Sequence, residues 1–334
     1  MQAAVIADRT IDELNDPRET QKELACPLCG GIQGSGLLLT APDRFHWRQD
    51  VYTLRRCSSC SCVWLDNPPR PEEMGVHYDE DYHRAITAAG EQFADRRWQR
   101  QRNAICRHKQ GGTILDVGCS SGGFLSTMTN GSWKLYGIEM EEATAARARA
   151  KTGAEVFVGD AVKAPFSAGF FDVVTAFDLL EHVYDPGKFL AKVLEWLKPG
   201  GIFHAVLPNI DSWEARLFGS YWYGLELPRH LFHFSPRSLR QLMAVVGFEE
   251  VSVVTPRVSY IETSAAYVYS SMIEKMGFSP TPEAKPRPRT LARRAVRKGI
   301  RVVSIAPFAQ VASWAGAGPS MEVIFRKPLT SNPR

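Results

Sequence analysis

The chain has 334 residues, of which 44% are hydrophobic and 10% aromatic. This composition excludes a disordered or fibrous chain and predicts a folded protein of two or three domains with one sizeable core. The formal net charge is only +4, but eight lysines and arginines gather within 285–301 without an acid, so the rest of the chain is mildly acidic. No apolar run reaches the length of a membrane span, and 1–20 lacks the apolar stretch of a signal peptide, which together predict a cytoplasmic protein.

Two cysteine pairs stand near the start of the chain. A polar leader over 1–22, expected to be disordered, is followed by Cys26 and Cys29 and then by Cys57 and Cys60. Two C-x-x-C knuckles at this separation are typical of a four-thiolate zinc ribbon with a hairpin between its knuckles. A disulfide and unliganded thiols are the alternatives. A reducing compartment disfavours the disulfide, and so short a ribbon has no core of its own.

The segment after the ribbon leads into the main domain. Tyr78 and Tyr82 are four residues apart, which predicts that they share one face of a helix. They either pack the ribbon onto the main domain or lie against a bound ligand. A basic, polar helix is expected over 91–109.

The most informative stretch is 113–125, T-I-L-D-V-G-C-S-S-G-G-F-L. Its apolar start predicts a buried parallel strand over 113–117, and Ser120 or Ser121 is suited to cap a following helix. Gly118 and Gly122 have no side chains, so backbone amides at the start of that helix can approach a ligand closely. We therefore expect a ligand site at this turn.

The same turn argues against a dinucleotide. Ser120 occupies the position at which the fingerprint G-x-G-x-x-G requires its second glycine, and Asp116 precedes the first glycine. A carboxylate there suits an ammonium or sulfonium group better than a pyrophosphate. Glu139 follows the next strand, expected over 134–138, where an acid can accept from both hydroxyls of a ribose.

Three further strands are predicted over 156–158, 171–177 and 202–207. The second of them ends at Phe177 and is followed by D-L-L-E-H-V-Y-D-P, in which Asp178, Glu181 and His182 stand at i, i+3 and i+4. These three side chains can converge on one helical turn near the reacting group. Capping or pairing is an equally good interpretation of Glu181.

An aromatic and basic stretch over 221–236 follows the last of these strands, on the side where open α/β sheets bind ligands. It contains Arg229, His230 and His233, and Ser235-Pro236 predicts the start of a helix that ends near 247. Aromatic and imidazole side chains suit a flat, hydroxylated substrate. We rank His230 ahead of His233 as general base, because the preceding Pro228-Arg229 constrains its position. The alternative is a packed loop with satisfied histidines.

The C-terminal part contains an insertion before the final strand. A helix is expected over 258–276, a proline-rich linker over 280–288, a basic helical stretch over 289–303 and an apolar stretch over 304–315. The segment 285–315 either contacts an anionic membrane surface or is a solvated helix packed on the body. Alternation over 320–326 predicts the last strand.

The motifs D-V-G-C-S-S-G-G, G-D-A, D-L-L-E-H and L-K-P-G-G stand in the order and spacing of the class I S-adenosylmethionine-dependent methyltransferases, which the chain resembles over 111–255. The resemblance implies an α/β fold with a Rossmann-like, seven-stranded sheet whose last strand is antiparallel. It implies that Asp160 accepts from the adenine amino group. It also implies that S-adenosylmethionine is contacted by Asp116, Gly118, Cys119, Ser120, Gly122, Glu139, Met140, Asp160, Ala161, Phe177, His182 and Tyr82.

Two narrower resemblances add expectations. The N-terminal part resembles methyltransferases of sugars and of cell-envelope or secondary-metabolite intermediates, in which a zinc module leads to an L-x-N-P turn and a tyrosine-rich helix that closes over the cofactor. The D-L-L-E-H segment resembles ubiquinone-pathway O-methyltransferases, in which two acids and the histidine hold a divalent cation. Magnesium is therefore a possible but disfavoured second metal, since related enzymes without metal share the segment.

Together these features predict six regions: a leader (1–22), a zinc ribbon (23–70), connecting or lid helices (71–110), a methyltransferase core (111–255), a basic and apolar insertion (256–317), and a final strand and tail (318–334). The expected reaction is O-methylation of a small or lipid-linked sugar or related metabolite, with His230, His182 and His233 as catalytic candidates. Carbon methylation is the alternative. The runner-up from another class is a zinc-ribbon binding protein with an idle methyltransferase fold, acting on RNA; no DNA partner is expected.

Overall fold

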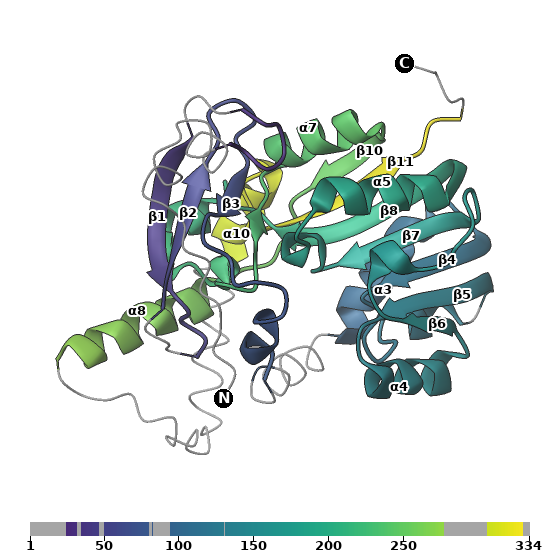
Figure 1. Ribbon diagram of the computed structural model, residues 1–334, viewed down its shortest axis with the longest axis horizontal. Helices are drawn as coiled ribbons and strands as arrows, with labels where there is room; N and C mark the ends of the chain where they lie inside the picture. The colour runs from purple at the N-terminus through teal and green to yellow at the C-terminus, as the bar shows by residue number, and fades with distance from the viewer. Residues whose placement is uncertain are drawn as a thin grey trace, which may run out of the picture.

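The computed structural model describes residues 25–31, 35–46, 50–79, 82, 94–129, 131–276 and 306–329. Its main feature is a seven-stranded sheet in the order β10-β11-β8-β7-β4-β5-β6 (Figure 1). Six predicted strands are confirmed, some with longer bounds: β4 (Gly111–Val117), β5 (Ser132–Glu139), β6 (Glu155–Val158), β7 (Phe171–Phe177), β8 (Leu197–Pro208) and β11 (Ser320–Arg326). The seventh strand, β10 (Glu249–Val254), was not placed from the sequence.

Strand direction follows the prediction as well. Strands β4 to β8 pair in parallel, whereas β11 is antiparallel to both β8 and β10. The strands β4, β7 and β8 are buried along most of their length, as expected for a sheet covered by helices. All carboxyl ends of the parallel strands therefore meet at one edge, where ligands bind in such sheets.

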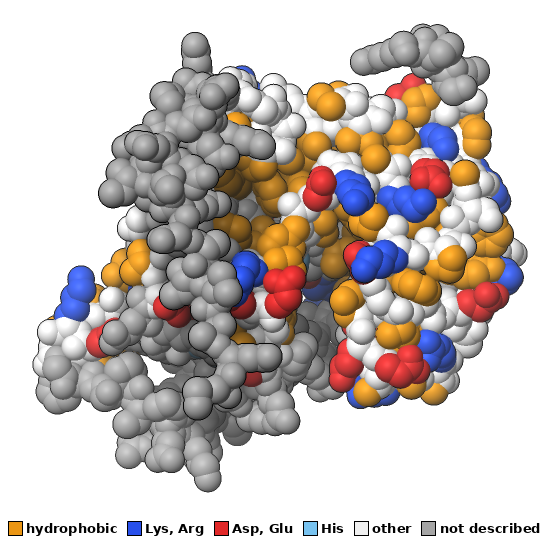
Figure 2. Space-filling view, in the orientation of Figure 1, with side chains coloured by type: hydrophobic (Ala, Val, Ile, Leu, Met, Phe, Trp, Pro, Cys, Tyr) orange, Lys and Arg blue, Asp and Glu red, His pale blue; other side chains and the backbone are white. Residues whose placement is uncertain are grey.

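Helices cover the sheet and set its edges. The helices α5 (Pro186–Trp196) and α7 (Pro236–Val246) pack together against β8 and β10, and α4 (Glu142–Thr152) packs against β5 and β6 (Figure 1). The predicted start of α7 is confirmed, because the Ser235 side chain accepts from the Ser238 amide and Pro236 is the first residue of the helix. On the face seen in Figure 2, lysines, arginines and acids are interspersed over this layer.

The helix expected directly after the glycine turn is wrong. The chain forms successive turns and then the short 3₁₀ helix η3 (Leu125–Met128). Gly122 has φ +77°, a left-handed conformation that a regular right-handed helix does not contain. The Gly118–Gly123 loop is therefore held by the strands around it rather than by the first turn of a helix.

A second sheet lies beside the first (Figure 1). Its four strands run in the order β1 (Gly36–Pro42), β2 (Val51–Arg56), β3 (Val63–Leu65) and β9 (Phe232–His233), all antiparallel. The first two form the hairpin expected between the cysteine pairs. The fourth comes from the aromatic and basic stretch after β8, so one sheet joins distant parts of the chain.

The two sheets share one apolar core. Leu54 and Trp64 of the smaller sheet belong to the same buried cluster as Phe203 and Trp196 of the larger layer. A ribbon of this size cannot bury enough apolar surface alone. Packing against the main body supplies that surface.

Helical elements complete the described chain. They include η2 (Met74–His77), α3 (Ala94–Cys106), α6 (Trp213–Phe218), α8 (Ile261–Lys275) and α10 (Ala306–Trp314). The helices predicted over 91–109 and 258–276 are confirmed within these bounds. The predicted leader, the proline-rich linker and the basic stretch over 289–303 lie outside the described residues. In the part of the chain that is described, no helix combines the length and apolar character needed to cross a membrane.

Candidate functional site

The glycine turn connects the carboxyl ends of β4 and β5. The amides of Gly118 and Cys119 both donate to the carbonyl of Ile138, at 2.9 and 3.0 Å, which closes the turn over the neighbouring strand. Gly118 has φ +73°, and a Cβ atom there would lie 3.2 Å from Leu179 Cδ1. Glycine is thus required by both backbone conformation and space.

Glu139 ends β5 and faces this turn. Its Oε2 accepts from the Ser120 amide at 3.0 Å, and its Oε1 accepts from the Met140 amide at 2.8 Å. These bonds fix the carboxylate at the strand end, next to the glycine turn. Ser120 itself has φ +47°, so the backbone is bent sharply toward the acid.

Asp116 lies deeper than the sequence suggested. It is only 3% exposed, and its Oδ1 accepts from Thr175 Oγ1 at 2.6 Å. Burial raises the pKa of Asp116 to about 7. Its predicted contact with an ammonium or sulfonium group stays a prediction, and it requires an approach through the glycine turn.

Cys119 packs rather than reacts. It is buried, and a Cβ atom on Gly137 would lie 2.7 Å from its Sγ, so the two residues fit only as a pair. Burial raises the pKa of its thiol. An inert structural thiol follows from this environment.

The remaining predicted cofactor contacts lie near the same edge of the sheet. Asp160 caps the 3₁₀ helix η4 (Ala161–Lys163) by accepting from the Val162 amide at 3.0 Å. Phe177 ends β7, with its ring 4.9 Å from that of Phe124. Met140 is 70% exposed. The structure brings these residues to one edge, and their contacts with a cofactor stay predictions.

The segment after β7 separates the two acids predicted to converge. Asp178 has φ +50° and its Oδ2 lies 2.5 Å from Arg97 Nη2 of α3. Glu181 turns inward instead, with both carboxylate oxygens buried and without a hydrogen-bond partner among the described residues. Burial and then the charge of Asp178 raise the pKa of Glu181 well above its usual value.

The three predicted histidines gather where this segment meets the aromatic loop. The rings of His182 and His230 are 4.7 Å apart, and those of His230 and His233 are 6.1 Å apart. One ligand atom from each of Glu181, His182 and His230 lies within 4.8 Å of the others. The third member of this group is therefore His230 and not Asp178.

Each imidazole has one nitrogen anchored to a backbone carbonyl. His182 Nδ1 lies 2.9 Å from the Arg229 carbonyl, His230 Nδ1 lies 3.0 Å from that of Gly224, and His233 Nε2 lies 3.0 Å from that of Leu225. A carbonyl only accepts, so the anchored nitrogen donates its hydrogen and the other nitrogen is left to accept. Burial lowers the pKa of His182 and of His233 to about 4, and it holds that of His230 well below its usual value.

Tyrosines and Glu226 surround the histidines. Tyr78 Oη lies 2.9 Å from His182 Nδ1, and Tyr82 Oη donates to Glu226 Oε1 at 2.7 Å. Glu226 Oε2 lies 3.7 Å from His230 Nε2. The rings of Tyr78 and Tyr82 touch edge to face at 5.2 Å, although Tyr78 follows η2 instead of sharing a long helix with Tyr82.

Four cysteines converge beside the connection between β2 and β3 of the smaller sheet. Cys26 Sγ lies 3.5 Å from Cys60 Sγ, and Cys29 Sγ lies 3.7 Å from Cys57 Sγ; all four thiols lie within 4.8 Å of one another and form no disulfide. The two knuckles have the same turn. Gly30 and Ser61, each directly after a second cysteine, have φ +68° and +60° and donate to the carbonyls of Cys26 and Cys57.

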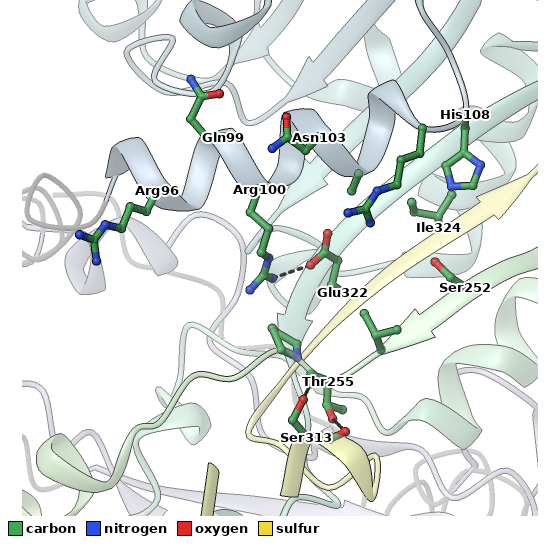
Figure 3. A pocket seen from close by; sticks show the side chains of 14 residues that line it. Arg96, Gln99, Arg100, Asn103, His108, Ser252, Thr255, Ser313, Glu322 and Ile324 are labelled. Carbon is green, nitrogen blue, oxygen red and sulfur yellow. Dashed lines mark hydrogen bonds and ion pairs between the residues drawn. The ribbon is translucent and has the colours of Figure 1, made fainter. Parts of the chain in front are cut away.

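A groove of about 830 Å³ lies elsewhere, between α3 and the strands β10 and β11 (Figure 3). Arg100 and Glu322 meet across it, and Glu322 also bonds His204 Nε2 at 3.1 Å. None of the predicted site residues lines the groove. It is separate from the glycine turn and the histidine cluster.

Comparison with known proteins decides the family. A family model described as "Methyltransferase domain" matches residues 89–253. A ubiquinone biosynthesis O-methyltransferase from Aromatoleum aromaticum is 30% identical over 156 residues, which cover 43% of this chain and 67% of that protein. The chain belongs to the S-adenosylmethionine-dependent methyltransferases.

Two further proteins similar to this methyltransferase have lower sequence identity. A probable S-adenosylmethionine-dependent methyltransferase from Mycolicibacterium smegmatis is 27% identical over 143 residues, covering 42% of this chain and 52% of that protein. A methyltransferase structure from Archaeoglobus fulgidus is 18% identical with a TM-score of 0.49, over 72% of this chain and 99% of that one. The chain spans about half the length of the first curated relatives it matches.

The glycine turn fits the methyltransferase cofactor in its chemistry. Glu139 presents a fixed carboxylate at the strand end, suited to two ribose hydroxyls, and Gly118 in the adjoining turn has no side chain. The contacts expected of Asp116 with a sulfonium or ammonium group and of Glu139 with a ribose stay predictions.

Sequence reasoning missed two residues of the methyltransferase site. Glu226 stands four residues before His230, a spacing that in hindsight pairs an acid with the histidine. Asp43 gave no signal, because it reaches the site from the β1–β2 connection through Arg229, at 3.4 Å. For Tyr78 the sequence left two interpretations open, packing of the ribbon onto the main domain or contact with a bound ligand.

Proposed function

We propose that this methyltransferase transfers a methyl group from S-adenosylmethionine to a hydroxyl oxygen of a small or lipid-linked sugar or a related metabolite. The observation that carries the proposal is the His182–His230 pair, each ring with Nδ1 bound to a carbonyl and therefore with Nε2 free to accept a proton. A hydroxyl becomes an effective nucleophile when its proton is removed as the new bond forms.

The surroundings favour His230 as the proton acceptor. Glu226 Oε2, 3.7 Å from His230 Nε2, stabilises the imidazolium that forms after the proton is taken up. Glu226 is itself held by Tyr82 Oη and by Arg229 Nε, at 2.7 and 3.4 Å. The lowered pKa of His230 keeps the ring neutral, and so able to accept, across the physiological range.

His182 and Tyr78 are suited to orient the acceptor. His182 is half-buried, whereas His230 and His233 are buried, so His182 lies nearest to an incoming ligand. Burial keeps the pKa of Tyr78 above its usual value, which leaves its hydroxyl protonated as a donor. His233, anchored to Leu225, supports the ring of His230 rather than the reaction.

The residues of the glycine turn would hold the cofactor. Glu139 would accept from its ribose hydroxyls, Asp160 from its adenine amino group, and the backbone of the turn at Gly118 would lie against its methionine part. The cofactor supplies an activated methyl group on a sulfonium. The protein contributes orientation, exclusion of water and removal of the proton.

We also propose that Cys26, Cys29, Cys57 and Cys60 bind one structural zinc ion. A tetrahedral site with Zn–S bonds of about 2.3 Å places its sulfurs about 3.8 Å apart, and the two measured separations are 3.5 and 3.7 Å. The matched knuckle turns support four ligands on one ion. Magnesium at Glu181 and the histidines remains the less favoured second metal.

The division into a leader, ribbon, lid, core, insertion and final strand remains part of the proposal, as does a cytoplasmic protein with peripheral contact between 285–315 and a membrane. Only α10 of that segment belongs to the described residues. An idle fold that binds RNA through its basic segment is the competing proposal. The ordered Glu139 and the anchored histidines speak against it.

The test is turnover with the purified protein. Cofactor labelled in its methyl group is incubated with fractionated metabolite pools, and the labelled product is analysed for O- or C-linkage. We expect one hydroxylated acceptor to take up the label on oxygen. A label on carbon would assign the same base to a C–H proton, and cofactor binding without any transfer would support the idle fold.

A further inference from the structure

The cysteine module, defined here as residues 25–66, is joined to the histidine loop by strand pairing. In the smaller sheet, Val63 pairs with His233 and Trp64 with Phe232, and the Leu65 amide donates to the Leu231 carbonyl at 2.8 Å. The strand β9, which contains His233 and starts two residues after His230, is thus the edge strand of the module's own sheet.

The second knuckle leads directly into that pairing. The Cys57 amide donates to the Cys62 carbonyl at 2.9 Å, and Val63 starts β3 at the next position. No flexible linker separates the thiol cluster from the strand. A change in the knuckle therefore displaces β3, and β3 holds β9.

A buried ion pair forms a second joint. Arg229 is 1% exposed, and its Nη1 lies 3.4 Å from Asp43 Oδ2 of the module. Its Nη1 also donates to the His77 carbonyl at 3.2 Å, and its Nε lies 3.4 Å from Glu226. The rings of Phe45 and Tyr82 cover the guanidinium, at 5.2 and 4.9 Å from their centroids.

The same residue holds a histidine with its backbone. The Arg229 carbonyl accepts from His182 Nδ1 at 2.9 Å, so one residue contacts the module with its side chain and the catalytic candidate with its main chain. Arg229 also directly precedes His230. The module and His182 cannot shift independently, because the single buried residue Arg229 makes both contacts.

Charge explains why this joint is rigid. Burial alone would raise the pKa of Asp43, but the Arg229 charge and hydrogen bonds from His46 hold it below its usual value, so the carboxylate stays ionised. Asp43 also accepts from the amides of Phe45 and His46, at 3.0 and 3.2 Å. A buried cation between two carboxylates has one favourable position, and leaving it costs an unpaired charge.

We propose that the cysteine module is a positioning part of the catalytic site, which holds His182 and His230 in place through β3 and the Asp43–Arg229 pair. The inference rests on the proposed function in so far as it assigns those histidines to proton removal. It differs from a separate binding module, which would contact a partner and leave the chemistry to the core. Arg229 and Asp43 are positioning residues and touch no reacting atom.

The test compares two isosteric changes in the module of the full-length protein. Asp43→Asn keeps the oxygen that accepts from the Phe45 and His46 amides but removes the charge facing Arg229. Asp66→Asn is the matched control, since it breaks the ion pair with Arg55 within the module, at 2.6 Å, and does not contact Arg229. Both are assayed well below their melting temperatures.

We expect Asp43→Asn to lower kcat by about 10- to 100-fold, the scale of a misplaced catalytic group. Its affinity for S-adenosylmethionine, measured by calorimetry, should stay unchanged, and Asp66→Asn should retain both values. Equal kcat in the two variants would overturn the proposal. An equal loss of kcat and of cofactor affinity would also overturn it, because that result indicates general damage.

Amide hydrogen exchange separates this inference from the proposed function. Exchange at 231–233 and at 63–65 should become faster in Asp43→Asn and stay at the wild-type rate in Asp66→Asn. This readout requires no acceptor and no methyl transfer. If no acceptor is ever methylated, the proposed function fails, yet faster exchange still supports the joint; unchanged exchange overturns it whatever the activity.

Discussion

The proposed cofactor side and the proposed acceptor side of this methyltransferase are built in different ways. Asp116, the glycine turn and Glu139 come from two adjacent parallel strands and the loop between them. The acceptor side draws on three distant segments: the cysteine module, the turn after β7 and the loop after β8. The first half is local in sequence, whereas the second exists only after long-range contacts have formed.

Because of this difference, the two sides have different structural requirements. The cofactor half requires a strand pair and glycines with left-handed backbone, which any stable sheet of this type supplies. The acceptor half requires a buried network of charges and imidazoles that is complete only when all three segments are present. We expect changes on the acceptor side to affect turnover, and changes on the cofactor side to affect binding.

The largest effect is expected at the histidine beside Glu226. His230→Ala removes the proposed proton acceptor and should lower kcat by roughly 100-fold or more, with little change in cofactor affinity. The measurement is steady-state turnover together with calorimetry. His108→Ala, at an exposed position two residues after the end of α3, is the control and should retain full activity. Full turnover in His230→Ala at every pH would make the loop structural.

The counterpart on the cofactor side is Glu139. Two charge-assisted hydrogen bonds to a ribose are lost in Glu139→Ala, which should weaken S-adenosylmethionine binding by roughly 2 to 3 kcal/mol without unfolding the protein. Calorimetry measures the change directly. Glu142→Ala, at the exposed start of α4, should bind like the wild type. Equal affinity of both variants would remove Glu139 from the cofactor site.

The features that could be predicted from the sequence lie mainly on the cofactor side, and those that could not lie mainly on the acceptor side. The strands and the place of Glu139 at a strand end were predicted, because apolar runs and acids at strand ends are local signals. The helix expected after the turn failed, since Gly122 takes φ +77°. The link from Asp43 through Arg229 to His182 spans more than one hundred residues of chain and has no local pattern.

Removing the metal should disturb the acceptor side through the module. We expect about one zinc per chain by elemental analysis, and Cys29→Ser should lose the ion and loosen the module before the core unfolds. Hydrogen exchange resolves the order of unfolding. Cys106→Ser, outside the thiol cluster, should keep the ion. A metal-free wild-type protein of native stability, purified under reducing conditions, would refute the zinc site.

A smaller effect, on stability, is expected at Glu322, which lies away from both the cofactor side and the acceptor side. Burial favours neutral Glu322, but its hydrogen bond with His204 and the Arg100 charge hold its pKa below the usual value. Its contribution to stability is therefore present above the ordinary pKa of a glutamate and is lost as pH falls through the lower folded value. Glu322→Gln should cost about 1 to 3 kcal/mol near pH 7.

Denaturant unfolding of wild type and Glu322→Gln at several pH values measures this cost. The difference should shrink in acid, where the wild-type carboxylate becomes protonated. Glu249→Gln breaks an exposed pair with Arg326 in the same sheet and should cost less than about 1 kcal/mol. A cost at Glu322 that does not change with pH would contradict the charge argument.

The central claim, that buried histidines remove the acceptor proton, is tested most directly by the pH dependence of kcat. A base must be unprotonated to work, and burial lowers the pKa of His182 to about 4 and that of His230 well below its usual value. Turnover should therefore persist as pH falls through 6.5, the usual pKa of histidine, and decline only well below it. A decline centred on the usual histidine value in the wild type, unchanged in His230→Ala, would contradict the account.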